Sequence, residues 1–276
     1  MLRNRRKLST IVNHILSKFN YHISKIDQPL INSKDSGKVL INLGSGNWSC
    51  ERWTNLDYVS EWYAEAQKNH KIIPYDIRND DLPFSDHSVD VIYCSHVIEH
   101  IENIHIQRMF KECYRVLKQG GIMRIACPDA EFLYQVSKFN NDFWNWRKEW
   151  FNSECFYSKK FQPRTVDFLV REIATPKLLN YVHSINKEDY HEAFETMDMY
   201  DFFELLTKDL VFRVDVVGDH INYWTFDKAK KMLQEAGFRS IIRSKWNGSV
   251  SEEMKQKYKF DIVYPNMSLY VESMKS

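Results

Sequence analysis

The sequence predicts an α/β protein with a doubly wound, mostly parallel sheet of seven strands and an aromatic-rich helical insertion. Two observations lead to this class. From Lys38 to Tyr134 short apolar runs alternate with helical patterns, and from His220 onward the alternation resumes. Strands and helices that alternate in this way form parallel sheets covered by helices. Between these stretches, residues 139–211 break the rhythm and are expected to form a helical cap.

The core of the fold is expected to comprise residues 38–138 and 212–276. Strands are predicted at 39–43, 54–57, 72–76, 89–94, 122–127, 240–246 and 267–274. Helices are predicted at 60–69, at 98–118 with Gly120-Gly121 as the stop, and from Thr225 as the N-cap to Gly237 as the terminating glycine. A polar loop without a clear crossover helix joins the last two strands, so they should pair antiparallel.

The insertion is rich in aromatic side chains. Residues 139–151, FNNDFWNWRKEWF, hold three tryptophans and three phenylalanines, and apolar helical stretches follow near 164–182 and 198–207. One interpretation is a cap with a small core of its own. The other, compatible with the first, is a lid whose aromatic faces line a substrate pocket and pack on sugar rings or planar groups.

Composition narrows the partners and the compartment. The 276 residues carry 38 basic and 37 acidic side chains, and a net charge of +1 gives no broad field to attract nucleic acid. The five cysteines form no C-x-x-C pair, which is typical of free thiols in a reducing compartment. No apolar run approaches the length of a membrane span. We therefore expect a cytoplasmic protein without a nucleic-acid partner, and no pattern indicates its oligomeric state.

Residues 1–37 are expected to form a basic helix followed by a polar linker. Ile11, Ile15, Leu16 and Phe19 fall on one helical face among arginines and lysines. Because this face is narrow, we favour a leader helix packed on the main domain. The alternative is peripheral contact of residues 1–20 with an anionic membrane at its inner face.

The stretch KVLINLGSGNWSCERWTNLD, residues 38–57, predicts a nucleoside-binding site. A buried strand leads into Gly44-Ser45-Gly46, where glycines let backbone approach a ligand closely, and a second strand ends in Asp57. A carboxylate at that strand end can accept both hydroxyls of a ribose. The third glycine of a dinucleotide motif is missing, and ten residues between Gly46 and Asp57 leave little room for a helix facing a pyrophosphate. This spacing favours S-adenosylmethionine over NAD.

Several segments together resemble class I S-adenosylmethionine-dependent methyltransferases, in particular the bacterial group with an L-N-L-G-[CS]-G signature that is associated with surface-glycan biosynthesis. The resemblance covers roughly 38–134 and 219–274 and implies the Rossmann-like methyltransferase fold. Its pieces are VLINLGSG (39–46), NLDY (55–58), YDIRNDDLPFSDHSVDVIYCSHVIEHI (75–101), VLKQGGIMRIACPD (116–129), FDKAKKMLQEAGF (226–238) and SLYVES (268–273).

The resemblance implies roles for the matched positions. Gly44, Ser45 and Gly46 would pass beneath the methionine part of the cofactor, Asp57 would bind the ribose, Asp76 with Ile77 would flank the adenine, and Ser95 and His96 would lie nearest the sulfonium. Leu43 and Tyr58 fall within the same matched motifs and complete the predicted set. The chain departs from the pattern at Asn42, where the motif usually has an acidic residue. The cofactor's amino group would lose a carboxylate contact there.

An alcohol acceptor needs a base as its proton leaves, and histidine suits neutral pH. The candidates are His96, His100 and His220, with Asp129 as a base or acceptor anchor at the end of the fifth strand. The run from His96 to His100 also matches the H-x-x-E-H zinc pattern. Because His96 should end a buried strand, the two histidines need not share a helix face, and we expect no metal.

Together these observations predict an S-adenosylmethionine-dependent O-methyltransferase that acts on a sugar or a glycan-linked intermediate. The alternatives are a methyltransferase for small molecules and a non-catalytic scaffold with the same fold. The glycan part rests on the resemblance and on the aromatic cap, so it is weaker than the reaction type.

Overall fold

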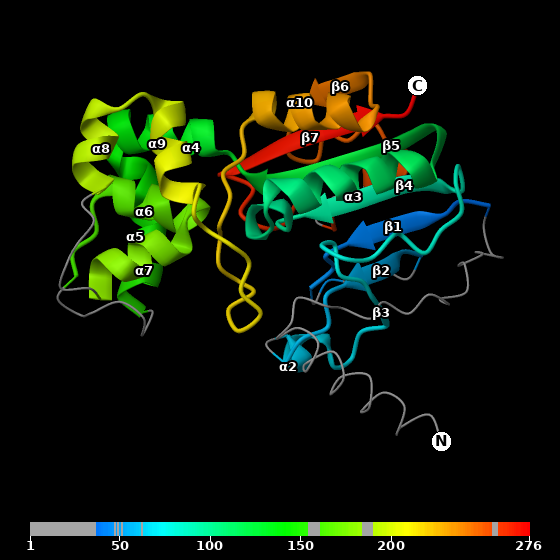
Figure 1. Cartoon of the computed structure of the whole chain (residues 1–276), viewed down its shortest axis with the longest axis horizontal. Helices are drawn as coiled ribbons and strands as arrows, with labels where there is room; N and C mark the ends of the chain where they lie inside the picture. Colours follow the sequence, from blue (N-terminus) through cyan, green and yellow to red (C-terminus); the bar gives the residue numbers. More distant parts are fainter. Residues whose placement is uncertain are drawn as a thin grey trace.

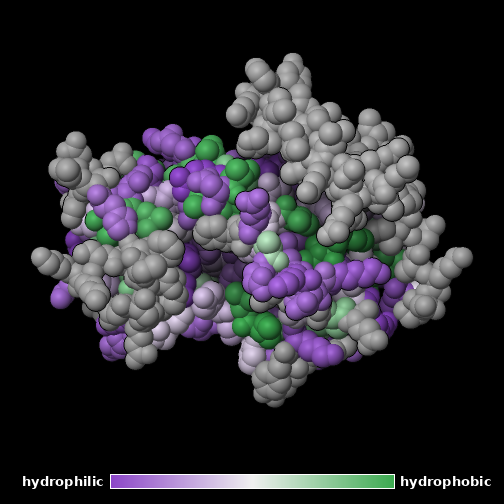
Figure 2. Space-filling model, turned by 90° about the horizontal axis from the view of Figure 1, so that it is seen from below, coloured by the Kyte–Doolittle hydropathy of each residue, from purple (hydrophilic) through white to green (hydrophobic). Residues whose placement is uncertain are grey.

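The computed structural model describes residues 37–46, 48, 50, 52–61, 63–153, 161–183, 190–255 and 259–276. The predicted basic helix and almost all of its linker lie outside these residues, as does Cys155. Within the described part of the chain, no helix has the length and apolar character needed to cross a membrane. On the face shown in Figure 2, small groups of hydrophobic residues are scattered among hydrophilic ones.

Seven strands form one sheet in the order β3-β2-β1-β4-β5-β7-β6 (Figure 1). Strands β1 to β5 pair in parallel, and β7 pairs antiparallel with both β5 and β6. The predicted fold class and the antiparallel pairing of the last two strands are therefore confirmed. The strands are β1 (Leu40–Leu43), β2 (Thr54–Asp57), β3 (Ile72–Pro74), β4 (Val89–Ser95), β5 (Leu117–Pro128), β6 (Ser240–Arg243) and β7 (Ser268–Met274).

Alternate residues of the central strands face opposite sides of the sheet, as the period of a strand requires. Ile92 and Cys94 of β4 join the large core beneath α3 (Asn103–Val116) and α10 (Phe226–Ala236), which pack against each other. Val91 and Tyr93 instead join a smaller cluster. That cluster is completed by side chains from two connections, Trp53 before β2 and both Met254 and Phe260 before β7.

The end signals of α10 act as predicted. Thr225 accepts a hydrogen bond from the backbone N–H of Lys228, and Gly237 adopts φ +115° at the C-terminus. The prediction that Gly120-Gly121 stops the preceding helix is wrong. That helix ends at Val116, because Leu117 turns to an extended conformation and pairs with Val89, so β5 runs through both glycines.

Two further predicted helices are shorter than expected. The helix predicted at 60–69 is reduced to α2 (Ala64–Gln67). The helix predicted at 98–118 begins instead with a 3-10 turn, η1 (Ile98–His100), and continues only from Asn103 as α3. The break between η1 and α3 is an extended residue, Ile101.

The helices between β5 and α10 gather beside the sheet, at the left of Figure 1. They are α4 (Ala130–Phe139), η2 (Asn141–Trp144), α5 (Asn145–Ser153), α6 (Thr165–Ile173), α7 (Thr175–His183), α8 (Tyr190–Thr196) and α9 (Met199–Thr207). We call them the helical lobe. The continuous stretch predicted at 164–182 is divided at Ala174, whose backbone is not helical, and Pro176 in the first turn of α7 lacks the N–H that a continuous helix would need there. Trp144, Phe168 and Phe202 are fully buried in a core that belongs to the lobe.

Candidate functional site

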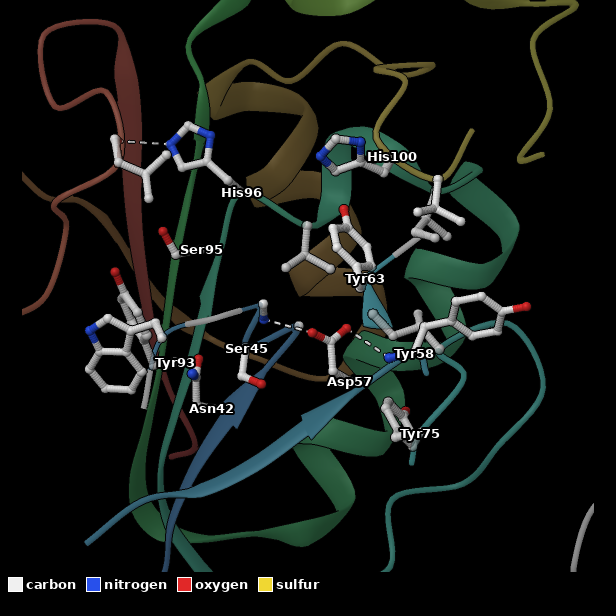
Figure 3. Close-up of a pocket in the computed structure, with 18 of the residues that line it drawn as sticks. Asn42, Ser45, Asp57, Tyr58, Tyr63, Tyr75, Tyr93, Ser95, His96 and His100 are labelled. Atoms are coloured by element: carbon white, nitrogen blue, oxygen red, sulfur yellow. Dashed lines mark hydrogen bonds between the residues drawn. The ribbon is translucent and has the colours of Figure 1, made fainter. Parts of the chain in front are cut away.

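A cavity of about 470 Å³ opens at the carboxyl ends of β1, β2 and β4 (Figure 3). This volume lies within the range of about 300–1,000 Å³ typical of ligand pockets. Most of the predicted cofactor residues line it, whereas Leu43 points into the core and is fully buried. The predicted residues that line the cavity are Asn42, Gly44, Ser45, Gly46, Asp57, Tyr58, Asp76, Ile77, Ser95 and His96.

The glycine turn after β1 depends on residues without side chains. Gly44 has φ +65°, and a Cβ atom there would lie 2.2 Å from Cγ2 of Val97. Gly46 has φ +55°, and a Cβ atom there would meet no other atom within 4 Å, in the open space of the cavity. The turn is tied to β2, because the N–H of Gly44 donates to the carbonyl of Leu56 at 2.8 Å.

Asp57 ends β2 with its carboxylate at the wall of the cavity. It accepts hydrogen bonds from the N–H of Gly46 at 2.6 Å, the N–H of Tyr58 at 2.7 Å and Nε2 of Gln67 at 3.2 Å. Burial nevertheless raises the pKa of Asp57, and these three hydrogen bonds only partly offset it. A carboxylate has about four acceptor positions, so it can still accept from a ligand.

Asp76 is held differently. Arg78 donates to it through Nε at 2.9 Å and Nη2 at 2.7 Å, and Asn79 donates at 3.0 Å. Burial would raise the pKa of Asp76, but the hydrogen bonds and charge of Arg78 outweigh burial and lower it. The Arg78 guanidinium also lies 4.0 Å from the ring centroid of Phe212. The predicted contact of Asp76 with adenine stays a prediction, and the carboxylate already has strong partners.

Three polar atoms of cavity residues are buried without a hydrogen-bond partner among the described residues, namely Oγ of Ser45, the hydroxyl of Tyr75 and Oγ of Ser95. An unpaired buried polar group costs about 1–3 kcal/mol. A ligand that carries polar groups would remove this cost. Together with the glycine turn and the ribose-type carboxylate of Asp57, these atoms show that the residues present fit S-adenosylmethionine.

His96 follows the last residue of β4, Ser95, with φ +55° and does not belong to a helix. Its Nε2 lies 3.1 Å from the carbonyl oxygen of Val263 and 3.0 Å from Oγ of Ser268. Its Nδ1 lies 3.0 Å from Oε1 of Glu99. A carbonyl only accepts, so Nε2 carries the hydrogen of the ring, and Nδ1 can donate to Glu99 only when His96 is protonated. As expected, His96 and His100 do not lie on one helix face.

His100 lines the cavity, and its Nδ1 lies 2.9 Å from the carbonyl oxygen of Asp219. A carbonyl only accepts, so Nδ1 carries the hydrogen and Nε2 keeps its lone pair. His220 is fixed in the same way by the carbonyl of Glu172, at 2.7 Å from Nδ1. The two rings lie 4.7 Å apart, centroid to centroid, and His220 is buried behind His100 rather than lining the cavity.

Asp129 does not line the cavity. It begins α4 as the N-cap and accepts from the N–H of Phe132 at 3.1 Å. Its other oxygen pairs with Nη2 of Arg243 at 2.5 Å. These contacts give Asp129 a structural role at the start of the lobe, and its predicted role as a base or acceptor anchor stays a prediction.

The aromatic insertion does not line the cavity either. Among its described residues none contributes to the wall, and the tryptophan Trp144 is buried in the lobe instead. The interpretation of the segment as a lid over this cavity is therefore not what the structure shows. The many aromatic residues indicated a hydrophobic core, but the sequence could not show whether that core belongs to the helical lobe or borders the cavity.

Several cavity residues were missed at the level of sequence. Tyr63 lies between Asp57 and His100 with its hydroxyl toward His100 (Figure 3), and burial raises its pKa to about 12. Glu99 does not itself line the cavity but lies beside His96, and it was visible in the sequence only as part of the H-x-x-E-H run. Phe212 and Val263 come from connections far along the chain, where no motif marked them.

Residues 36–125 match the model of a methyltransferase domain family. This segment holds β1 to β4, most of β5 and most of the cavity wall. No curated protein matches the chain.

Solved structures of methyltransferases align with it at low similarity. One is the methyltransferase domain of a citrinin polyketide synthase, at 12% identity and a TM-score of 0.42, covering 89% of this chain and 48% of that one. A second, from Thermotoga maritima, is described as a possible histamine N-methyltransferase, at 13% identity and a TM-score of 0.41, covering 86% and 82%. A third, an S-adenosylmethionine-dependent methyltransferase from Archaeoglobus fulgidus, has 12% identity and a TM-score of 0.41, covering 97% and 94%. The chain thus spans about half of the first structure and most of the other two.

Proposed function

We propose that this chain, an S-adenosylmethionine-dependent methyltransferase, transfers the methyl group to a hydroxyl oxygen of a sugar or a glycan-linked intermediate. The cofactor supplies a methyl carbon that its sulfonium sulfur has already activated. The chain has to hold the acceptor in line with that carbon and to exclude water. Asp57 and the glycine turn would hold the cofactor, which leaves the upper part of the cavity in Figure 3, near His96 and His100, for the acceptor.

The observation that carries the choice of oxygen is the group of ionisable side chains at that end. His96, Glu99 and His100 lie together after β4, and His220 lies behind them. A hydroxyl is a poor nucleophile until its proton is withdrawn, and such a group can do this, whereas a carboxylate acceptor has no need of it. Of these side chains, His100 lines the cavity with Nε2 not engaged by Asp219, so the hydroxyl should meet the group at His100.

Support for a sugar comes from the cavity wall at the acceptor end. Tyr63 lines the cavity with its hydroxyl toward His100 (Figure 3), whereas Tyr58 and Phe212 pack beside Arg78 at the cofactor end. Aromatic faces pack on the apolar faces of sugar rings while polar groups bind the hydroxyls. The support is thus independent of the aromatic insertion.

The test is methyl transfer from labelled S-adenosylmethionine to panels of sugar hydroxyls, non-sugar alcohols, amines and carboxylates. We expect sugar hydroxyls to be methylated, and His100→Ala to lower kcat/KM by about 10²–10⁴-fold, the usual contribution of proton withdrawal. His105→Ala on α3 is the matched control and should change little. Transfer to small non-sugar molecules with none to sugars would disprove the sugar assignment, and full activity in His100→Ala would disprove the role of His100.

A further inference from the structure

We propose that Glu99, His100 and His220 hold a divalent ion of a first-row transition metal beside the acceptor end of the cavity. The inference deepens the proposed function, since it states how the ionisable group would act on a hydroxyl, and that use of the ion rests on the proposed function. The site itself rests only on the geometry of the three side chains.

The three side chains converge. One ligand atom from each, a carboxylate oxygen of Glu99 and a ring nitrogen of each histidine, lies within 4.8 Å of the other two. Zinc binds such atoms at about 2.0–2.1 Å in tetrahedral geometry, so its ligand atoms lie about 3.3 Å from one another. Closing the set around an ion therefore needs the ligand atoms to approach one another by up to about 1.5 Å.

Both imidazoles are oriented as metal ligands usually are. Nδ1 of His100 and Nδ1 of His220 each donate to a backbone carbonyl, of Asp219 and Glu172 respectively. Metal-binding histidines are commonly fixed in this way, because the second hydrogen bond sets the tautomer and the ring orientation. It leaves the Nε2 lone pair of each ring for a ligand.

Glu99 supplies the independent observation. Its side chain is only 1% exposed, and neither carboxylate oxygen makes a hydrogen bond within the described structure. The one cationic partner recorded for it is Nδ1 of His96, at 3.0 Å from Oε1, and that group is charged only when protonated. A buried carboxylate without hydrogen bonds is costly unless a cation compensates it. A bound ion would do so, and His96 would then hold the ligand from behind.

The set of ligands selects the class of metal. Two imidazoles and one carboxylate suit zinc, iron, cobalt or manganese, whereas magnesium and calcium prefer oxygen ligands alone. Three protein ligands leave coordination positions open. Because His100 lines the cavity, an acceptor hydroxyl there could join the ion, which would lower the pKa of that hydroxyl. The earlier expectation of no metal concerned His96 and His100 on one helix, whereas this set recruits His220 from another part of the chain.

The test is metal binding by the full chain after removal of metal with a chelator. Zn²⁺ is titrated by calorimetry and Co²⁺ by its visible absorption, without cofactor or acceptor, and thermal unfolding is followed with and without Zn²⁺. We expect one ion per chain, a raised Tm with Zn²⁺, and a loss of affinity of at least about 10–100-fold in Glu99→Gln, since removing even an outer partner of a ligand costs that much. His105→Gln and Glu235→Gln, outside the set, are the controls.

Should Glu99→Gln not fold, His100→Gln at the cavity wall provides the second variant. Binding that is absent from the wild type, or equal in the wild type and in the folded variant, overturns the metal site. Binding that depends on Glu99 and His100 supports it, even where no hydroxyl acceptor is methylated, and the proposed function would then fail alone. Full methylation of a sugar by metal-free protein that binds no ion would leave the proposed function standing and remove the metal site.

Discussion

The cavity and the helical lobe differ in how their buried polar groups are hydrogen-bonded. In the lobe, the buried charged groups have partners: Arg147 donates to Oε1 of Glu172 at 2.5 Å and 3.1 Å, and Asp167 accepts from Tyr190 and from His191, although Oε2 of Glu172 has no hydrogen bond. Along the cavity wall, Oγ of Ser45, Oγ of Ser95 and the hydroxyl of Tyr75 are buried without a hydrogen bond among the described residues, as are both oxygens of Glu99 next to His100.

The difference separates two uses of buried polarity. A satisfied pair holds helices together and fixes their arrangement, as between α5 and α6, which carry Arg147 and Glu172. Buried groups without a hydrogen bond destabilise the ligand-free protein. This destabilisation is removed when a ligand forms the missing hydrogen bonds. We therefore expect substitutions in the lobe to change stability, and substitutions at the cavity to change binding.

The sharpest way to break this comparison is to remove a partner in the lobe. Arg147→Met leaves the carboxylate of Glu172 buried with only weaker neighbours, and breaking a buried pair typically costs about 3–5 kcal/mol. Urea unfolding should show that loss in the free energy of unfolding. Arg164→Met, an exposed arginine of the same lobe, is the control and should cost less than about 1 kcal/mol. Equal losses in both variants would contradict the idea that the pair holds the lobe.

At the cavity, Asp57→Ala should act on binding instead. It removes a carboxylate positioned for the ribose hydroxyls, and a hydrogen bond to a charged group is worth about 1.5–3 kcal/mol. Calorimetric titration should show S-adenosylmethionine affinity lowered at least about 10²-fold. The free energy of unfolding should also fall, by about 1–3 kcal/mol, because the N–H groups of Gly46 and Tyr58 lose their acceptor. Asp86→Asn at an exposed site is the control, and tight binding by Asp57→Ala would place the cofactor elsewhere.

His220 joins the two regions, because its carbonyl partner belongs to α6 while its ring lies behind His100. Its folded-state pKa is depressed, so the unfolded chain takes up the proton first as the pH falls. The contribution of His220 to stability is thus present above about pH 6.5 and is lost below it, by up to about 1.4 kcal/mol per pH unit.

Urea unfolding of metal-free protein between pH 5 and pH 7.5 measures this dependence. His220→Gln, which cannot take up the proton, should show a shallower loss toward low pH than the wild type, and His105→Gln should keep the wild-type slope. An unchanged slope in His220→Gln would mean that other groups cause the acid loss.

How far the sequence could predict this molecule depends on the range of each interaction. The glycine turn and Asp57 were predictable because a strand, a tight turn and the next strand end lie within twenty residues. The cap of α10 by Thr225 is equally local. The end of α3 was mispredicted because the pairing of Leu117 with Val89, far apart in the chain, overrode the local signal of two glycines.

The ionisable group at the acceptor end shows the same limit. Three histidines were identified by residue type, but only the fold brings His220 behind His100, through a carbonyl of the lobe. The lone pair on Nε2 of His100 follows from the hydrogen bond between Nδ1 and the carbonyl of Asp219. The sequence contains no pattern that predicts this hydrogen bond. Likewise, the tryptophans of the insertion correctly predicted a hydrophobic core. That the described ones do not line the cavity is a result of tertiary packing, which the sequence does not show.

Asp76 provides the smallest expected effect and the finest test of the comparison, because it lies at the cavity yet is satisfied like a group of the lobe. Its carboxylate already binds Arg78 through two nitrogens. If satisfied groups serve architecture, Asp76→Asn should lower S-adenosylmethionine affinity by less than about tenfold, which is under 1.4 kcal/mol. The same variant should cost some stability, since Arg78 loses its ionic partner and keeps the rings of Phe212 and Tyr58 beside it. A loss of affinity as large as that of Asp57→Ala would instead mean that Arg78 yields to the adenine on binding, and that a satisfied carboxylate can still be a ligand group.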